Sequence, residues 1–165
     1  MEELTKLPNL AKAVIAVMKE VKGIDKTLNV GTGQSSYKGV SDKDVKQIVG
    51  SAMEKHGLCI LPIEINPTTH IERWEEVDQY SKSEPKDKKV KQQVFTEATT
   101  KYLLLHESGE STVLAGYGQG VDSQDKGAGK STTYALKYCL LYTFMIPTGK
   151  IDDADKTQPK KDASS

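Results

Sequence analysis

The residues of this sequence that are best suited to do chemistry are lysines and tyrosines in its C-terminal third. Lys130, Tyr134 and Lys137 follow one another at intervals of four and three residues, so in a helix they would lie along one side. The two ammonium groups can neutralise phosphates, and the ring between them can stack on a base or a deoxyribose. Lys126 precedes them, near a helix N-terminus whose free backbone N–H groups favour an anion. The pattern predicts a surface that binds a phosphate backbone.

One predicted helix, Lys130–Met145, must position these side chains. It contains no glycine or proline, and Pro147 and Gly149 end it. The segment before it, from Tyr117 onward, is polar and rich in glycine, which predicts a loop rather than a regular element. The other side of the helix is small and mostly apolar, and we expect it to pack on a sheet. Its residues are Thr132, Ala135, Leu136, Cys139 and Thr143.

Two other interpretations of these lysines stay open. The run GAGKS at Gly127–Ser131 is similar to a P-loop, which cradles nucleotide phosphates. A P-loop requires a glycine where Gln124 stands, however, and the short stretch after the helix offers no strands to complete an NTPase. Alternatively, the lysines form an ordinary solvated face of a helix, which is the commoner meaning of such a pattern.

No catalytic or metal-binding constellation is recognisable. The histidines show no metal-ligand spacing; they are His56, His70 and His106. Asp122 and Asp125 lie in the Gly-rich segment, where aspartate is common because it tolerates turn geometry. The acids after Gly149 offer no rigid metal shell for a nuclease. We therefore expect a protein that is not an enzyme and uses no metal or cofactor.

Composition sets the remaining limits. The chain has 165 residues, with 23 basic and 23 acidic side chains, so its net charge does not itself indicate nucleic acid. We expect one domain over residues 1–150 and a polar, disordered tail over residues 151–165. No apolar run is long enough to span a membrane, and no signal peptide begins the chain, which indicates the cytoplasm. Cys59 and Cys139 are typical of small core residues in a reducing compartment.

Two helices are predicted in the N-terminal third. The first runs from Asn9, its expected cap, to about Lys22, with an apolar stripe that packs or contacts another subunit. The second follows a cap at Ser41 and ends at Gly57. Between them, residues 29–36 are polar and are expected to form a loop leading to Tyr37 and Lys38.

Strands follow these helices. Leu58–Pro67 alternates like a strand, and Pro62 places it at a sheet edge or at a bulge. Ile71–Tyr80 fits either a strand or a helix, and a strand is favoured. Ser81–Lys91 is expected to be a mobile loop, whose lysines are either simply solvated or add a sequence-independent attraction to DNA. From Val94 a β-hairpin is predicted, with its turn at Ser108-Gly109. Three strands followed by a helix predict an α+β domain.

The stretch GVDSQDKGAGKSTTYALKYCLLYTFMIPTGKIDD, residues 120–153, resembles the signature of the ERF family, phage recombination proteins that anneal complementary single strands. The segments YKGVSDKDV (37–45) and HGLCILP (56–62) also resemble the family. The signature positions are Gly120, Asp125, Lys126, Lys130, Thr133, Ala135, Lys137, Tyr138, Ile146, Pro147, Thr148 and Gly149. Here Gly-Lys-Ile precedes the acids after Thr148, whereas the family more often runs directly from Thr-Gly into acidic residues.

The resemblance implies ATP-independent annealing of single-stranded DNA by an antiparallel sheet packed on the long helix (a β-β-β-α core), with N-terminal helices. It also implies a homo-oligomer, either a ring or a filament like those of the related eukaryotic Rad-type proteins, and a phage exonuclease and a host single-strand-binding protein as partners. We expect Tyr138 to be buried at the helix flank. The alternative function is a single-stranded nucleic-acid-binding protein that does not anneal. The residues expected to contact DNA are Lys126, Lys130, Lys137, Tyr134, Tyr37, Lys38 and Tyr117.

Overall fold

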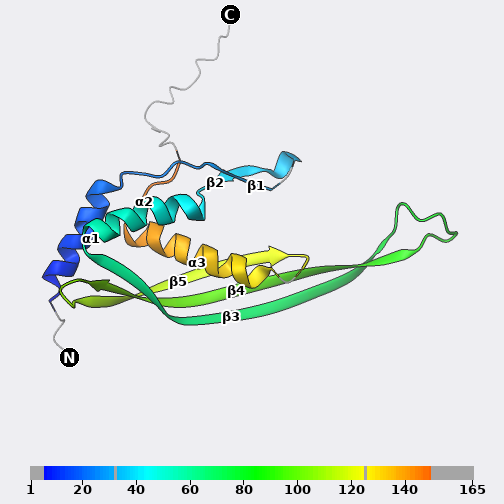
Figure 1. Cartoon of the computed structure of the whole chain (residues 1–165). Helices are drawn as coiled ribbons and strands as arrows, with labels where there is room; N and C mark the ends of the chain where they lie inside the picture. Colours follow the sequence, from blue (N-terminus) through cyan, green and yellow to red (C-terminus); the bar gives the residue numbers. More distant parts are fainter. Residues whose placement is uncertain (1–5, 32, 125, 150–165) are drawn as a thin grey trace, which may run out of the picture.

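A three-stranded antiparallel sheet forms the centre of the fold in the computed structural model, which describes residues 6–31, 33–124 and 126–149 (Figure 1). The spatial order is β3-β4-β5. The register of β3 against β4 shifts between Pro62 and Glu64, which confirms the predicted edge strand and bulge. The strands are β3 (Leu58–Val77), β4 (Lys88–His106) and β5 (Ser111–Asp122).

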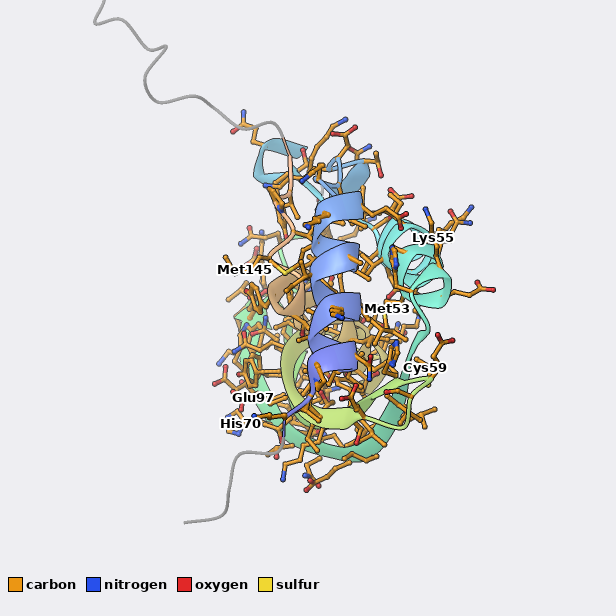
Figure 2. All side chains as sticks on the ribbon, turned by 90° about the vertical axis from the view of Figure 1, so that its left-hand side faces the viewer. Met53, Lys55, Cys59, His70, Glu97 and Met145 are labelled. Carbon is orange, nitrogen blue, oxygen red and sulfur yellow. The ribbon has the colours of Figure 1, made fainter. Side chains whose placement is uncertain are left out.

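The helices lie on one face of this sheet (Figure 1). The long helix packs on β5 and β4, and the two N-terminal helices join it at one end of the sheet. Seen from that end, the sheet curves beneath the helices (Figure 2). The helices are α1 (Pro8–Glu20), α2 (Asp42–Lys55) and α3 (Gly127–Thr143). This arrangement confirms the predicted α+β class.

The core lies where the three helices meet the sheet. Val17 of α1, Val49 of α2, Leu104 of β4 and Phe144 after α3 are all fully buried in one cluster. Burying side chains of this size stabilises the fold by about 1.5–3 kcal/mol each. The core therefore fixes the position of α3 through contacts with every layer.

A row of glycines in β5 lets α3 approach the sheet closely. A Cβ atom at Gly118 would overlap the carbonyl oxygen of Ser131, and one at Gly120 would lie 2.5 Å from that of Gly127. The row is Gly116, Gly118 and Gly120. Our expectation of a loop before the helix was therefore wrong up to Asp122, because these alternate glycines serve helix–strand packing and not chain flexibility.

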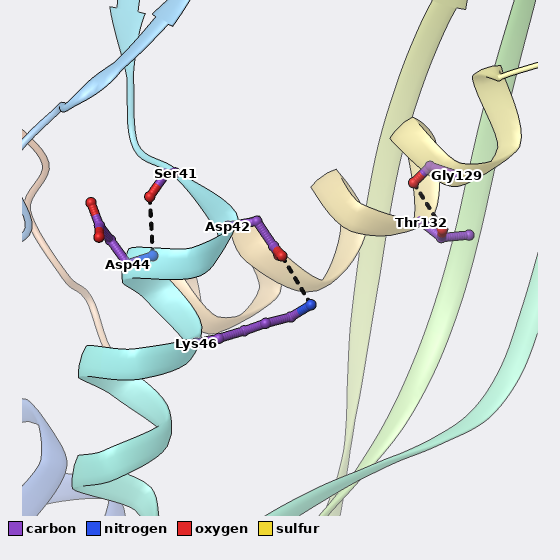
Figure 3. Close-up of polar contacts among 6 residues, drawn as sticks. All are labelled: Ser41, Asp42, Asp44, Lys46, Gly129 and Thr132. Carbon is purple, nitrogen blue, oxygen red and sulfur yellow. Dashed lines mark hydrogen bonds and ion pairs between the residues drawn. The ribbon is translucent and has the colours of Figure 1, made fainter.

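The helix ends follow local rules, with two corrections. Ser41 caps α2 as predicted, because its Oγ accepts a hydrogen bond of 3.0 Å from the Asp44 N–H (Figure 3). Asn9 is not the cap of α1, because the helix already begins at Pro8: proline has the right φ for a first helical position and lacks the N–H that would be unpaired there. Helix α3 begins at Gly127, three residues before the predicted start.

A small hairpin stands where the sequence predicted a polar loop. Strands β1 (Leu28–Val30) and β2 (Tyr37–Gly39) pair antiparallel, with a short 3₁₀ helix, Gly33–Ser35, between them. Tyr37 and Lys38 of this hairpin border the same hollow as the C-terminal half of α3.

Strands β3 and β4 extend beyond β5 as a two-stranded ribbon (Figure 1). We define the ribbon as Glu72–Val77 and Lys88–Gln93, because Asp122 at the end of β5 pairs with Val94. The strand predicted from Ile71 is thus confirmed as far as Val77, whereas the predicted loop over 81–91 is shorter than expected, because β4 already begins at Lys88. The predicted tail, 151–165, lies outside the described residues. No helix within the described ranges has the length and apolarity needed to cross a membrane.

Candidate nucleic-acid interface

A cleft of about 860 Å³ lies between the β1–β2 hairpin, the open edge of β5 and the C-terminal half of α3. Its walls combine aromatic rings with lysines from three elements that are far apart in the sequence. The tyrosines and lysines that line it are Tyr37, Tyr117, Tyr134, Tyr138, Tyr142, Lys26, Lys38 and Lys137. Five of the seven residues predicted to contact DNA therefore border this cleft, but the ring of one of them, Tyr117, points to the opposite face of the sheet.

Three tyrosines form a ladder along α3. The ring centroids of Tyr134 and Tyr138 are 6.3 Å apart, and those of Tyr138 and Tyr142 are 6.0 Å apart. Tyr138 is 41% exposed and Tyr142 is 75% exposed. The expectation that Tyr138 is buried was wrong. Ser131 and Tyr138 lie on the same side of α3, and this side packs on β5 at Ser131 but faces the cleft at Tyr138. The ladder therefore offers rings on which bases can stack.

Lys137 lies in the wall of this cleft and not on a solvated helix face. Its side chain is only 5% exposed, and its Nζ donates a hydrogen bond of 3.0 Å to the carbonyl oxygen of Val40. The same Nζ lies 4.6 Å from the ring centroid of Tyr134 and 5.2 Å from that of Tyr138. The sequence expectation of an open lysine was thus wrong, because α2 and the residues before it cover this side of α3.

Burial lowers the pKa of Lys137 below its ordinary value, and the Asp42 carboxylate partly offsets this effect. Among the described residues, no carboxylate lies within 4.0 Å of the Lys137 Nζ. An ammonium has three donors, and aromatic faces only partly replace water around it. The wall of the cleft consequently holds a cation that an anion such as phosphate would stabilise.

Lys130 and Lys126 lie at the other end of α3, away from the residues that line the cleft. The Nζ of Lys130 lies 2.9 Å from Oδ2 of Asp122, and this hydrogen bond raises the pKa of Lys130 and lowers the pKa of Asp122. The charge of Lys130 is therefore already compensated within the protein. At the same end, Thr132 Oγ1 donates to the carbonyl oxygen of Gly129 at 3.1 Å (Figure 3).

The other predicted tyrosines contribute unequally. Tyr37 of β2 is exposed in the cleft wall, beside Lys38. Tyr117 borders the cleft at the edge of β5, but it alternates with Gly116 and Gly118, which face α3, so its ring points to the opposite face of the sheet. Its hydroxyl accepts a hydrogen bond of 2.6 Å from Gln119 Nε2.

Tyr142 and Lys26 line the cleft but were not predicted to contact DNA. The spacing of Tyr134, Tyr138 and Tyr142, four residues apart, was the signal that could have revealed the ladder. Nothing in the sequence around Lys26 indicated that this residue lines the cleft, because only the folding of the chain brings the segment after α1 there. Within the described ranges, no three His, Cys, Asp or Glu side chains gather to hold a metal ion.

Comparison with known proteins gives one finding on identity. The model of the ERF superfamily matches residues 10–165, which is nearly the whole chain. A comparison with curated protein sequences found no match. On the extent of the family match, the chain belongs to the ERF superfamily, a family of single-strand annealing proteins.

Proposed function

We propose that this protein binds single-stranded DNA and anneals complementary strands during phage recombination, without hydrolysing a nucleotide. Membership of the ERF superfamily supports this function. The observation that carries it is the cleft in which the Tyr134–Tyr138–Tyr142 ladder, Tyr37 and buried Lys137 come together. Proteins that hold single strands without regard to sequence do so with aromatic rings and cations along one groove.

In this proposal the two kinds of side chain have separate tasks. Lys137, Lys38 and Lys26 neutralise phosphates as the strand runs along the cleft. The tyrosines stack on bases or sugars, and because every base has a π-face this contact does not select a sequence. Neither task breaks a covalent bond, so the proposed reaction needs no catalytic group.

The Lys126–Lys130 end of α3 has a secondary place in the proposal. Lys130 would contact phosphate only by exchanging its ion pair with Asp122 for one with DNA. Such an exchange adds little affinity, because an exposed ion pair and a phosphate contact are of similar strength. We therefore assign the main phosphate contacts to the cleft.

The P-loop alternative is disfavoured by the position of its residues. Gly127–Ser131 forms the first turns of α3 and not a loop ahead of the helix. A P-loop instead wraps its backbone N–H groups around the phosphates before the helix begins. The closer rival is a protein that coats single strands without speeding their pairing, since it would use the same tyrosines and lysines.

One such domain contacts only a few nucleotides, so useful affinity requires a row of copies. We propose a homo-oligomer, as a ring or a filament, acting in the cytoplasm of the bacterial host. A phage exonuclease would supply the single strands, and a host single-strand-binding protein is the other proposed partner.

The test is the annealing of two complementary labelled oligonucleotides with chelator present and no ATP. The proposal predicts pairing that is clearly faster than the spontaneous reaction. Tight binding with no acceleration would instead establish the coating protein. A requirement for ATP or for a divalent metal would contradict the proposal.

A further inference from the structure

The amine of Lys137 has a property that phosphate binding does not use, because it lies in a part of the cleft wall from which water is largely excluded. Its Nζ lies 4.6 Å from the ring centroid of Tyr134 and 5.2 Å from that of Tyr138, and the side chain is only 5% exposed. Two aromatic faces thus replace much of the water that would surround an ammonium. Desolvation of this kind favours the neutral amine, which is a nucleophile.

No carboxylate of the described residues holds this amine in its charged form. Asp42 is the acid whose charge acts on Lys137, but its Oδ2 forms an ion pair of 2.9 Å with Lys46 instead (Figure 3). Burial has the larger effect and lowers the pKa of Lys137, so more of it is neutral than of a lysine with the ordinary pKa. Lys26 and Lys38 also line the cleft, but both are exposed to water. Of these three lysines, Lys137 is therefore the best prepared to act as a nucleophile.

The carbonyl group of Val40 orients the amine. Its oxygen accepts a hydrogen bond of 3.0 Å from the Lys137 Nζ. A neutral lysine has two N–H groups and one lone pair on Nζ, and a single N–H group is enough for this bond. The lone pair therefore points away from the Val40 oxygen and is free to meet an electrophile in the cleft.

A single strand of DNA contains such an electrophile wherever a base has been lost. The deoxyribose of an abasic site opens in part to an aldehyde at C1′, the atom that carried the base. In the proposed function the tyrosines stack on the bases of the bound strand, so C1′ of each nucleotide lies beside the ladder. An abasic nucleotide leaves the space of its base empty and exposes its aldehyde there, next to the Lys137 amine.

We propose that Lys137 forms an imine with the C1′ aldehyde of an abasic site in a strand that lies in the cleft. The inference rests on the proposed function, because the strand must first bind there. The Nζ lone pair forms a bond to C1′, the two hydrogens of the neutral amine leave with the aldehyde oxygen as water, and a C=N double bond remains. No oxidant or reductant takes part. The surrounding rings exclude water and so slow the hydrolysis that reverses the step. The protein thereby holds a damaged strand covalently and reversibly.

Reductive trapping tests this assignment. The full chain is incubated with a labelled single strand that carries an abasic site, and sodium cyanoborohydride converts the imine to a stable amine. A product of protein joined to the strand should appear on a denaturing gel, and mass spectrometry should place the principal link on Lys137. A principal link on Lys26, Lys38 or any other residue overturns the proposal. This mapping uses the unaltered protein, so it does not depend on the folding of a variant.

Two variants add a quantitative test. Lys137→Arg keeps a cation in the cleft wall, but a guanidinium does not form an imine, so at saturating protein the yield of trapped product should fall about tenfold or more. Lys43→Arg is the matched control, since Lys43 is exposed on α2 and does not line the cleft. Its yield should equal that of the wild type. Equal yields from Lys137→Arg and the wild type would overturn the proposal.

A strand with a tetrahydrofuran analogue of the abasic site separates this proposal from the function on which it rests. The analogue has no aldehyde, so the protein should bind it without being trapped. If fluorescence anisotropy shows that this strand does not bind, the proposed function fails, and the imine fails with it. If this strand binds but the aldehyde strand is not trapped, the imine alone is overturned.

Discussion

The Nζ of Lys137 donates a hydrogen bond of 3.0 Å to the carbonyl oxygen of Val40, which precedes it by 97 residues. This contact joins α3 to the residue before the Ser41 cap of α2, and it holds the ammonium against the rings of Tyr134 and Tyr138. A cation that would be mobile on an open helix is thus fixed in the wall of the cleft. Its position makes it the charge to test first.

Lys137→Met should weaken binding of single-stranded DNA and make the dependence of log affinity on log salt shallower by about one unit, as expected for one lost phosphate contact. The difference in DNA affinity between the wild type and Lys137→Met should also vanish as the pH rises. Burial lowers the pKa of Lys137, so its charge is present well below 10.5 and is lost earlier than that of an open lysine. Fluorescence anisotropy from neutral to alkaline pH measures both effects, and equal affinities at neutral pH would refute the contact.

The lowered pKa of Lys137 also predicts how stability depends on pH. Between the folded-state pKa and the ordinary value of 10.5, the unfolded chain binds more protons than the folded chain. The contribution of Lys137 to the free energy of unfolding should therefore increase as the pH rises through this window. Urea denaturation should show that the free energy of unfolding of the wild type, relative to that of Lys137→Met, increases as the pH rises through this window. A relative decrease would contradict the buried position of Lys137.

Tyr138→Ala should weaken DNA binding by about 1–3 kcal/mol, or 5- to 150-fold, because it removes the central ring of the ladder. Tyr138→Phe keeps the π-face and should bind nearly as well as the wild type. Tyr80→Ala is the matched control, since Tyr80 lies after β3 and is 89% exposed. Anisotropy titrations with a labelled oligonucleotide compare the three, and equal losses for Tyr138→Ala and Tyr80→Ala would refute the ladder.

Asp122→Asn should strengthen the sequence-independent attraction of DNA. The change frees the Lys130 ammonium, which now forms an ion pair of 2.9 Å with Asp122, and so adds one available cation. The salt dependence should become steeper by about one unit. If the slope for Asp122→Asn equals that of the wild type, this end of α3 does not meet the strand.

Gly118→Ala should destabilise the protein by about 1–3 kcal/mol, because the new methyl group would overlap the Ser131 carbonyl and push α3 off the sheet. Gly129→Ala adds the same group on α3 where nothing lies within 4 Å, so it should be neutral or stabilise by up to about 1 kcal/mol. Urea denaturation measures both changes. Equal effects would mean that the glycine row does not set the distance between helix and strand.

Local patterns in the sequence predicted those parts of the fold that depend on neighbouring residues. The Ser41 cap, the left-handed Gly57 just after α2, the bulge near Pro62 and the order of strands before α3 all follow from short stretches. Each results from a rule that acts over a few residues, such as capping or alternation. The family resemblance gave the same architecture independently.

The candidate site depends on contacts between distant segments, and there the sequence was a weaker guide. A helical wheel gives a helix one environment along its length, whereas α3 lies on β5 at Ser131 and faces a cleft at Tyr138. The burial of Lys137 depends on Val40, and the direction of Tyr117 depends on which face of β5 its glycines occupy. None of these can be read from residue spacing within α3.

Photo-crosslinking of a single strand that carries 4-thiothymidine, followed by mass spectrometry of the crosslinked peptides, tests the central claim most directly. We predict that the crosslinks fall on the cleft, at Tyr134, Tyr138, Tyr142 or Tyr37, and that they decrease in Tyr138→Ala. Crosslinks confined to the Lys126–Lys130 end of α3, or to the sheet face that carries Tyr117, would contradict the cleft as the DNA-binding site.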